Sequence, residues 1–216
     1  MARYLPLFPL SIVVFPGEKL NLHVFEPRYR QLVLDCVEDK NTFGIPTYIQ
    51  NGVGLYGTEV RLVQIEKKYD SGEIDIRTEG IEVFKLLQFD KTAPAKMYAG
   101  GELETVPQID DEDLVMKQNI TALLHELYEA LGLSKLSVEL PENYKIFSIA
   151  HELGLTLEQE YALLQLKRES ARQELVLQHL QQTLPVVQQT EQLKDRVRLN
   201  GHFKNLLPPN FCAPLL

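Results

Sequence analysis

Short apolar runs, many of them alternating with polar residues, fill the first half of the chain and are separated by glycine and proline. They predict strands over residues 4–10, 12–15, 20–25, 43–49, 60–69, 73–78 and 81–89. Phe15-Pro16-Gly17-Glu18 and Asp70-Ser71-Gly72 are typical turn sequences between them. Pro46 predicts an edge or a bulge in its own strand. Many short strands at this spacing favour a barrel or a sandwich over a parallel sheet with crossover helices.

Helical periodicity interrupts the strands once and then takes over. A helix is expected from Pro27, a good first helical residue, to about Asp39, with its apolar side at every third or fourth position. After Val106 the period changes. The acidic run at 110–113 suits the start of a helix, and an apolar stripe over 114–131 follows it, closed by Gly132.

Further helix starts and stops are expected in the second half. A helix is expected to open at Pro141 and stop at Gly154. Two capping boxes then place helix starts at Leu157 and Ala171; their residue pairs are Thr156 with Gln159 and Ser170 with Gln173. Pro185 is expected to kink or break the last helix. The chain is therefore expected to divide into a β-rich domain over 1–106 and a helical domain over 107–216.

Composition excludes several classes of protein. Of the 216 residues, 44% are hydrophobic and 24% charged, which is typical of a globular chain. The net charge is −8 and neither half has a basic excess, which disfavours nucleic acid as a partner. No apolar run is long enough for a membrane span, and the first residues do not resemble a signal peptide. Two cysteines cannot form a disulfide framework, so a cytoplasmic protein is expected.

The search for catalytic chemistry gives a negative result. There is no phosphate-binding loop, and Gly52, Gly54 and Gly57 are better explained as glycines that ease a hairpin. His125 and His151 each precede a glutamate but lack the second histidine of a zinc-protease motif, so packing or boundary roles are expected. Cys36 lies on the apolar side of its helix and is expected to be inert, because buried thiols are poor nucleophiles. The sequence predicts no catalytic residue, no cofactor and no metal, with an enzyme of unknown type as a remote alternative.

The most informative segments lie in the first 80 residues. They are Leu5-Pro6-Leu7-Phe8-Pro9-Leu10, Phe15-Pro16-Gly17, the run from Leu20 to Arg30 that contains Phe25-Glu26-Pro27-Arg28-Tyr29-Arg30, Phe43-Gly44-Ile45 and Arg77-Thr78-Glu79-Gly80. This pattern resembles the N-terminal substrate-binding domain of Lon-type ATP-dependent proteases. It is most similar to the free-standing bacterial proteins built from that domain alone. The resemblance covers residues 3–105 well. In the helical remainder it extends to the order and type of the secondary-structure elements.

The resemblance implies an α+β protein in which a PUA-like β pseudobarrel precedes an α-helical bundle with a long C-terminal helix and tail. It also implies that the ATPase and protease modules of Lon are absent, because the chain stops before either could begin. The function implied is that of a non-catalytic module that binds unfolded or apolar protein segments. Such a module serves as an adaptor in protein quality control, with a separate ATP-dependent protease as a further partner.

Residue-level roles stay open between two interpretations. Phe15, Phe25 and Tyr29 either determine the fold or edge an apolar groove that binds peptides. Glu26 is expected either to cap the helix at Pro27 or to pair with Arg28 or Arg30, as charged residues at such a corner do.

Two further alternatives remain. PUA-like barrels elsewhere recognise RNA, so an RNA-binding protein is the runner-up, although the acidic balance argues against it. The segment after Pro185 is expected either to fold back over an apolar surface, with Phe203, Leu206, Leu207 and Phe211, or to dock on a second subunit as a homodimer. A frayed tail is the plain alternative.

Overall fold

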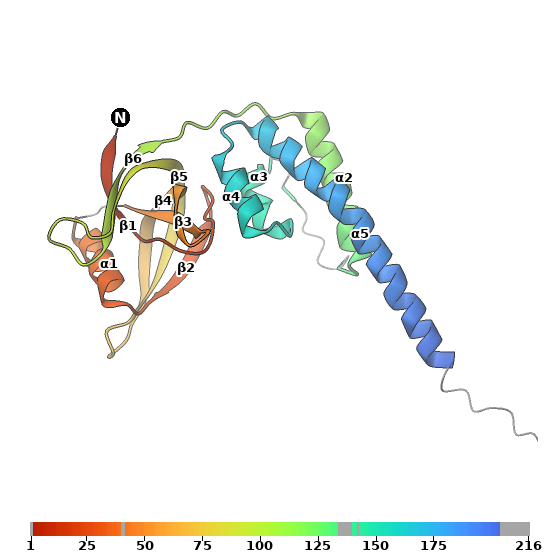
Figure 1. Ribbon diagram of the computed structural model, residues 1–216, viewed down its shortest axis with the longest axis horizontal. Helices are drawn as coiled ribbons and strands as arrows, with labels where there is room; N and C mark the ends of the chain where they lie inside the picture. Colours follow the sequence, from red (N-terminus) through yellow and green to blue (C-terminus); the bar gives the residue numbers. More distant parts are fainter. Residues whose placement is uncertain (1, 40–41, 134–139, 142, 204–216) are drawn as a thin grey trace, which may run out of the picture. The chain divides into compact units, whose positions relative to one another are not determined.

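A computed structural model describes residues 2–39, 42–133, 140–141 and 143–203, with side chains as far as residue 194. Its strands are β1 (Arg3–Leu7), β2 (Lys19–Val24), β3 (Phe43–Ile49), β4 (Gly52–Lys68), β5 (Ile74–Asp90) and β6 (Ala99–Thr105). Its helices are α1 (Pro27–Asp39), α2 (Leu114–Ala130), α3 (Ile146–Ile149), the short 3-10 helix η2 (Ala150–Glu152), α4 (Leu157–Gln165) and α5 (Glu169–Phe203) (Figure 1).

The strands form one sheet that closes on itself. Their order is β2-β5-β4-β3-β1-β6, and β6 also pairs with β5. Neighbours are antiparallel except β1 and β3, which pair in parallel at Leu7 and Gly44. The long strand β5 makes closure possible, because its first half pairs with β2 and its second half with β6. A closed sheet followed by helices confirms the predicted α+β class.

The chain separates into two compact units. Unit 1 comprises Met1–Asp113 and Pro141–Leu175, and unit 2 comprises Leu114–Leu140 and Val176–Leu216. Unit 1 thus includes helical residues that the expected division at residue 106 assigns to the second domain. Contacts explain this grouping, because the Tyr161 hydroxyl on α4 accepts a hydrogen bond from the Tyr56 N–H of β4 (3.0 Å).

The interior of unit 1 is apolar on both sides of β3. One cluster lies between the sheet and α1 and includes Phe43, Ile45 and Leu32, and a second includes Leu7 and Phe84. Alternate residues of β3 supply the first cluster, while Gly44 lies against Leu7 and Phe84 of the second. The strand can therefore be buried on both faces only because one face has almost no side chain at that position.

Several local predictions are confirmed. The Glu18 N–H donates to the Phe15 carbonyl (3.1 Å) with Gly17 at φ 84°, as a turn with glycine in its third position requires. The helix over 27–39 and the strand over 43–49 have the predicted bounds, and the register shifts at Pro46 as a bulge does. The capping box of Thr156 is present, and α4 begins at the next residue.

Residues 12–15 form no strand, so that prediction was wrong. Val14 and Phe15 are buried, but side chains bond two of their main-chain groups in place of a neighbouring strand. The Phe15 N–H donates to Glu18 Oε2 (2.9 Å), and the Val14 carbonyl accepts from the Thr58 hydroxyl. An apolar run of this length predicts burial, which a strand and an irregular segment share.

Two strands that contain glycine also differ from the sequence expectations. Gly80 was expected to separate two runs, yet β5 continues through it. A Cβ atom there would lie 2.3 Å from the Phe15 carbonyl oxygen, so the glycine permits the segment before β2 to approach β5 closely. Strand β6, which contains Gly100 and Gly101, was not predicted. Their lack of side chains makes room for the Tyr4 ring and the Gln88 carbonyl.

The start of α5 differs from the prediction as well. The helix begins at Glu169, and the expected capping box of Ser170 and Gln173 is absent. Asp111 caps the helix instead, accepting from the Ser170 N–H (3.1 Å) and hydroxyl (2.7 Å). The side chain of Gln173 bonds the main chain instead: its Oε1 accepts from the Asp113 N–H (2.8 Å). The acidic run therefore serves a helix distant in sequence.

Of the remaining helical predictions, some are confirmed and others are wrong. The helix expected at Pro141 begins at Ile146 and is only four residues long, although Gly154 at φ 68° ends the segment as predicted. Pro185 breaks nothing, since α5 is continuous through it (Figure 1). The tail residues after Phe203 lie outside the described residues.

Candidate functional site

The three aromatic candidates lie in different environments. Phe15 is fully buried and Tyr29 is 6% exposed, whereas Phe25 is 60% exposed. The Phe15 ring stacks on Phe147 with centroids 5.1 Å apart, and the Tyr29 ring stacks on Phe8 at 3.8 Å. Phe15 and Tyr29 therefore pack in the core, Tyr29 also lines a groove described below, and Phe25 faces solvent.

Glu26 pairs with one of the two arginines expected as its partners. Its Oε2 accepts a hydrogen bond from Arg28 Nε (2.8 Å), so it pairs with Arg28 in an exposed ion pair. Arg30 points elsewhere and donates to the Ser71 carbonyl (3.1 Å). This arrangement ties the start of α1 to the turn between β4 and β5.

His151 links the turn before β2 to α4. Its Nε2 lies 3.1 Å from Glu18 and its Nδ1 lies 2.8 Å from Glu160, and its ring packs against Phe15. The Glu18 hydrogen bond, assisted by Glu160, raises the pKa of His151 to about 9. The imidazolium thus has both nitrogens occupied, which removes it as a general base and makes it a structural ion pair.

This pairing predicts a pH dependence. A pKa raised above the ordinary 6.5 means that the ion pair stabilises the folded state fully below pH 6.5 and ceases to do so as pH rises through about 9. Because His151 is partly exposed, we expect His151→Gln to cost only about 1 kcal/mol at pH 6. Urea unfolding at pH 6 and pH 10 measures the difference, which should vanish at pH 10. The exposed His125→Gln is the control, and a His151→Gln deficit that is equal at both values contradicts the assignment.

A buried ion pair lies at the start of α5. Glu169 and Arg172, whose side chains are 3% and 5% exposed, pair at 2.7 Å in the first turn of α5. Glu169 also accepts from the Ile146 N–H (2.7 Å), and the guanidinium lies 3.8 Å above the Phe147 ring. Arg172 further donates to the Leu166 carbonyl (2.8 Å). The group is fully engaged within unit 1 and fixes α3 against α5.

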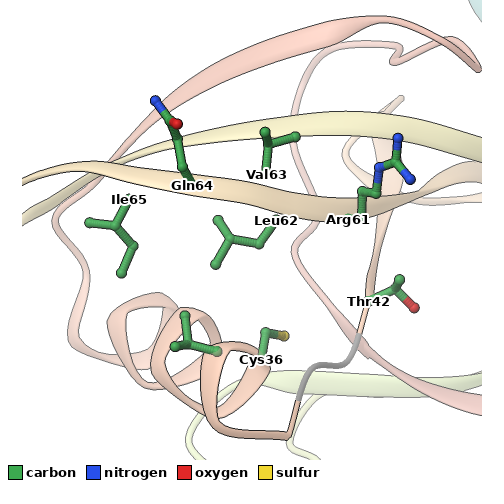
Figure 2. A pocket seen from close by; sticks show the side chains of 8 residues that line it. Cys36, Thr42, Arg61, Leu62, Val63, Gln64 and Ile65 are labelled. Carbon is green, nitrogen blue, oxygen red and sulfur yellow. The ribbon is translucent and has the colours of Figure 1, made fainter.

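An open groove of about 480 Å³ lies between α1 and β4 (Figure 2). We call it the α1–β4 groove. It is lined by Cys36, Val37, Thr42, Arg61, Leu62, Val63, Gln64 and Ile65. Leu62 and Ile65 point from the strand toward the helix, and Cys36 points back toward them (Figure 2). Burying one large apolar side chain in such a space is worth about 1.5–3 kcal/mol. The groove can therefore hold an apolar side chain of a partner.

A strand irregularity creates this lining. Leu62 and Ile65 are three residues apart and would face opposite sides of a regular strand. The register of β4 against β5 shifts between Leu62 and Gln64, and this brings both side chains to the same side. Strict alternation along residues 60–69 places Leu62 and Ile65 on opposite faces, so this pattern does not predict that they line one groove. The mixed character of both faces over 60–69 is the one signal that could have indicated the bulge.

Cys36 contributes apolar surface and no reactivity. Burial raises the pKa of its thiol to about 12, with a further effect from Asp35. A thiol with this pKa stays protonated at neutral pH and is a poor nucleophile. The expectation of an inert, buried cysteine is consistent with this environment.

A second groove of about 620 Å³ lies elsewhere on unit 1. Tyr29, Tyr48 and Phe89 line it together with Arg28 and Lys91. Aromatic side chains give large contact areas at low entropic cost. Unit 1 therefore presents two separate surfaces that suit apolar or aromatic side chains.

Two features are absent from the described residues. No group of three His, Cys, Asp or Glu side chains there could hold a metal ion. Within the same part of the chain, no helix is both long and apolar enough to span a bilayer.

Comparisons with known proteins agree with this architecture. The Lon protease of Anaeromyxobacter dehalogenans is 25% identical over 212 residues, which is 90% of this chain and 25% of that protein. The crystal structure of a Lon N-terminal domain protein from Xanthomonas campestris has a TM-score of 0.64 at 27% identity, covering 81% of this chain and 97% of the other. The N-terminal domain of the Mycobacterium avium complex Lon protease, at 13% identity and TM-score 0.60, covers 83% and 98% and shares the fold.

The chain spans about a quarter of the length of the curated Lon relative. The family model of the ATP-dependent protease La (LON) substrate-binding domain matches residues 4–182, which include β1 from its second residue, every element from β2 to α4, and the beginning of α5. The match confirms the resemblance seen in the N-terminal motifs. The chain belongs to the LON substrate-binding domain family.

Proposed function

We propose that this chain is a non-catalytic module that binds unfolded segments of client proteins and presents them to a separate ATP-dependent protease. The observation that supports this most is the family match together with an open apolar groove in the matched region. An unfolded chain exposes apolar side chains that a folded protein buries, so a groove of this kind discriminates between the two.

The α1–β4 groove is the first surface that we assign to client side chains. Val37 lines the groove and is 46% exposed. The charged residue in the lining is Arg61, and its guanidinium pairs with Glu79 (2.6 Å). An apolar client side chain therefore meets an apolar wall whose single cation is already neutralised. Binding there gains free energy from the area removed from water.

A matched pair of variants tests this assignment. Val37→Glu places a carboxylate in the groove, and we expect it to weaken binding of an unfolded client about tenfold, because that charge must be desolvated. Leu34 is 48% exposed on the same helix but does not line the groove, so Leu34→Glu is the control. Fluorescence anisotropy with a labelled, reduced and unfolded casein-like chain gives both affinities.

The result has a clear opposite. Equal affinities for the two variants would remove the groove from the proposal, and an unaltered protein that does not bind the unfolded client at about 50 µM would remove the function itself. A pull-down with a purified ATP-dependent protease tests the adaptor role separately.

A further inference from the structure

The second groove, of about 620 Å³, has a preformed apolar wall. Its aromatic and aliphatic lining residues are Tyr29, Tyr48, Phe89, Pro9, Val53 and Ala99. Ala99 belongs to the core cluster of Leu7 and Phe84, and Val53 and Phe89 pack against that cluster. The closed sheet therefore holds this wall in place. Ligand pockets of proteins enclose about 300–1,000 Å³, so the groove has room for an aromatic side chain and its neighbours.

Cations and neutral polar groups make up the rest of the lining. These residues are Arg28, Asn51, Gly52 and Lys91, and no aspartate or glutamate of the described chain is among them. Arg28 pairs with Glu26 (2.8 Å), and its guanidinium lies 4.4 Å from the centre of the Tyr29 ring. Lys91 is exposed and has no ion pair or hydrogen bond with another described residue. An unpaired ammonium group therefore lines the groove.

The carboxylate next to Lys91 in sequence does not reach the groove. Asp90 Oδ2 accepts from the Tyr4 hydroxyl (3.1 Å), and Asp90 Oδ1 accepts from the Gln88 amide (2.9 Å). Neighbouring side chains of a strand point to opposite faces, so Asp90 and the groove-lining Phe89 face apart. Asp90 is thus engaged on the other face of β5.

The carboxylates of α1 are paired or distant. Glu26 is engaged by Arg28 at the start of the helix, and Asp35, farther along, pairs with Lys96 (2.7 Å). The acidic residues at 38–39 lie in the last turn, about 15 Å along the axis from Arg28 at 1.5 Å per residue. The charge that α1 and β5 present to the groove is therefore positive or already paired.

The Tyr29 hydroxyl is a hydrogen-bond donor without an acceptor in the described chain. Tyr29 is 6% exposed, its ring stacks on Phe8, and no described residue bonds its hydroxyl. Burial raises the pKa of this hydroxyl, so it keeps its proton at neutral pH. The Tyr48 hydroxyl and the Asn51 amide also have no hydrogen bond with another described residue. Open donors beside an ammonium group favour an anionic acceptor on the ligand.

We propose that the second groove binds the part of an unfolded client in which an aromatic residue stands next to a glutamate or an aspartate. The inference rests on the proposed function and names the segments that this groove selects. The aromatic ring packs on Tyr48 and Phe89, where a large ring buries much area at low entropic cost. The carboxylate accepts from the Lys91 ammonium and the Tyr29 hydroxyl, whereas a basic residue in its place would meet two cations.

Two peptides and two proteins form a cycle that tests the charge. One labelled octamer has a glutamate between two phenylalanines and is otherwise glycine and serine, and its twin has glutamine at that position. We expect the unaltered protein to bind the glutamate peptide about fivefold more tightly, and Lys91→Gln to lose this preference. Lys68→Gln makes the same change of charge at an exposed lysine outside the lining and should keep it. Anisotropy titrations provide the four affinities and the control.

Tyr29→Phe tests the hydroxyl and leaves the ring on Phe8. We expect this variant to bind the glutamate peptide about fivefold more weakly, because a hydrogen bond to a charged group is lost. Its melting temperature should be unchanged, since no described residue bonds this hydroxyl. Tyr69→Phe is the control, because its hydroxyl bonds Asp75 (2.7 Å) outside this groove and its removal should leave peptide binding unaltered. Melting followed by circular dichroism separates lost binding from lost fold.

The inference has three opposite results. Equal affinity of the unaltered protein for the two peptides, a preference that persists in Lys91→Gln, or undiminished binding by Tyr29→Phe would each overturn it. In any of these cases, an unfolded client whose binding still depends on Val37 leaves the proposed function intact, so the two failures are distinguishable.

Discussion

Arg172→Ala is expected to lower the free energy of unfolding by about 3–5 kcal/mol, the largest effect of any single change considered for this chain. The reason is the partner that remains. Glu169 is only 3% exposed, and without the guanidinium its carboxylate stays buried with the Ile146 N–H as its main remaining bond. The loss of the contact with the Phe147 ring adds to the cost. Urea unfolding followed by far-UV circular dichroism measures the change.

Arg168→Ala is the matched control for this prediction. Arg168 is 59% exposed and pairs with Asp111 at 2.8 Å, one turn before Arg172. Exposed pairs of this kind contribute at most about 1 kcal/mol. If Arg172→Ala costs no more than Arg168→Ala, the buried pair does not hold α3 and α5 together as we describe.

Gly57→Ala is expected to destabilise the sheet by about 1–3 kcal/mol. A Cβ atom at this position would lie 2.4 Å from the Ile45 carbonyl oxygen and 2.5 Å from the Pro46 Cα, so main-chain atoms would have to move. The Phe84 ring, 2.7 Å away, closes the third side. Strands β3 and β4 could then keep their register only with strain.

Gly52→Ala separates this steric effect from the ordinary properties of glycine. Nothing lies within 4 Å of a Cβ at Gly52, so alanine there should be neutral or should stabilise by up to about 1 kcal/mol. Melting of the two variants under identical conditions makes the comparison. A Gly57→Ala protein as stable as Gly52→Ala would show that the approach of β3 to β4 is looser than the structure has it.

Features set by neighbouring residues were predictable from the sequence. The turn at Gly17, the helix from Pro27 and the capping box of Thr156 each depend on residues within a few positions of one another, and all three were predicted correctly. The N-terminal motifs also identified the family, because they combine several such local features in one order.

Features that depend on distant partners were not predictable. The cap of α5 comes from Asp111, some 60 residues earlier, and the glycines of β6 make room for Tyr4 and for the Gln88 carbonyl. A pattern of polar and apolar letters contains neither relation. The grooves follow the same rule, since the α1–β4 groove depends on a bulge in β4 whose position is set by pairing with β5.

The candidate site illustrates this limit. Three aromatic residues were proposed as groove-forming because of their chemistry, yet Phe15 packs in the core, Tyr29 is largely buried where it lines the second groove, and Phe25 is exposed without lining either groove. Sequence gives the chemistry of a side chain, whereas exposure is a property of the fold. For that reason the binding surfaces proposed here come from the structure and the family from the sequence.

The most direct test of the account compares one client protein in two states. A disulfide-containing protein is labelled and titrated with this chain by anisotropy, once folded with its disulfides intact and once reduced and unfolded. We predict binding of the unfolded form with a Kd on the order of 10 µM and at least about tenfold weaker binding of the folded form. Equal affinity for both forms, or no binding of the unfolded form, would contradict the claim that this chain recognises unfolded segments.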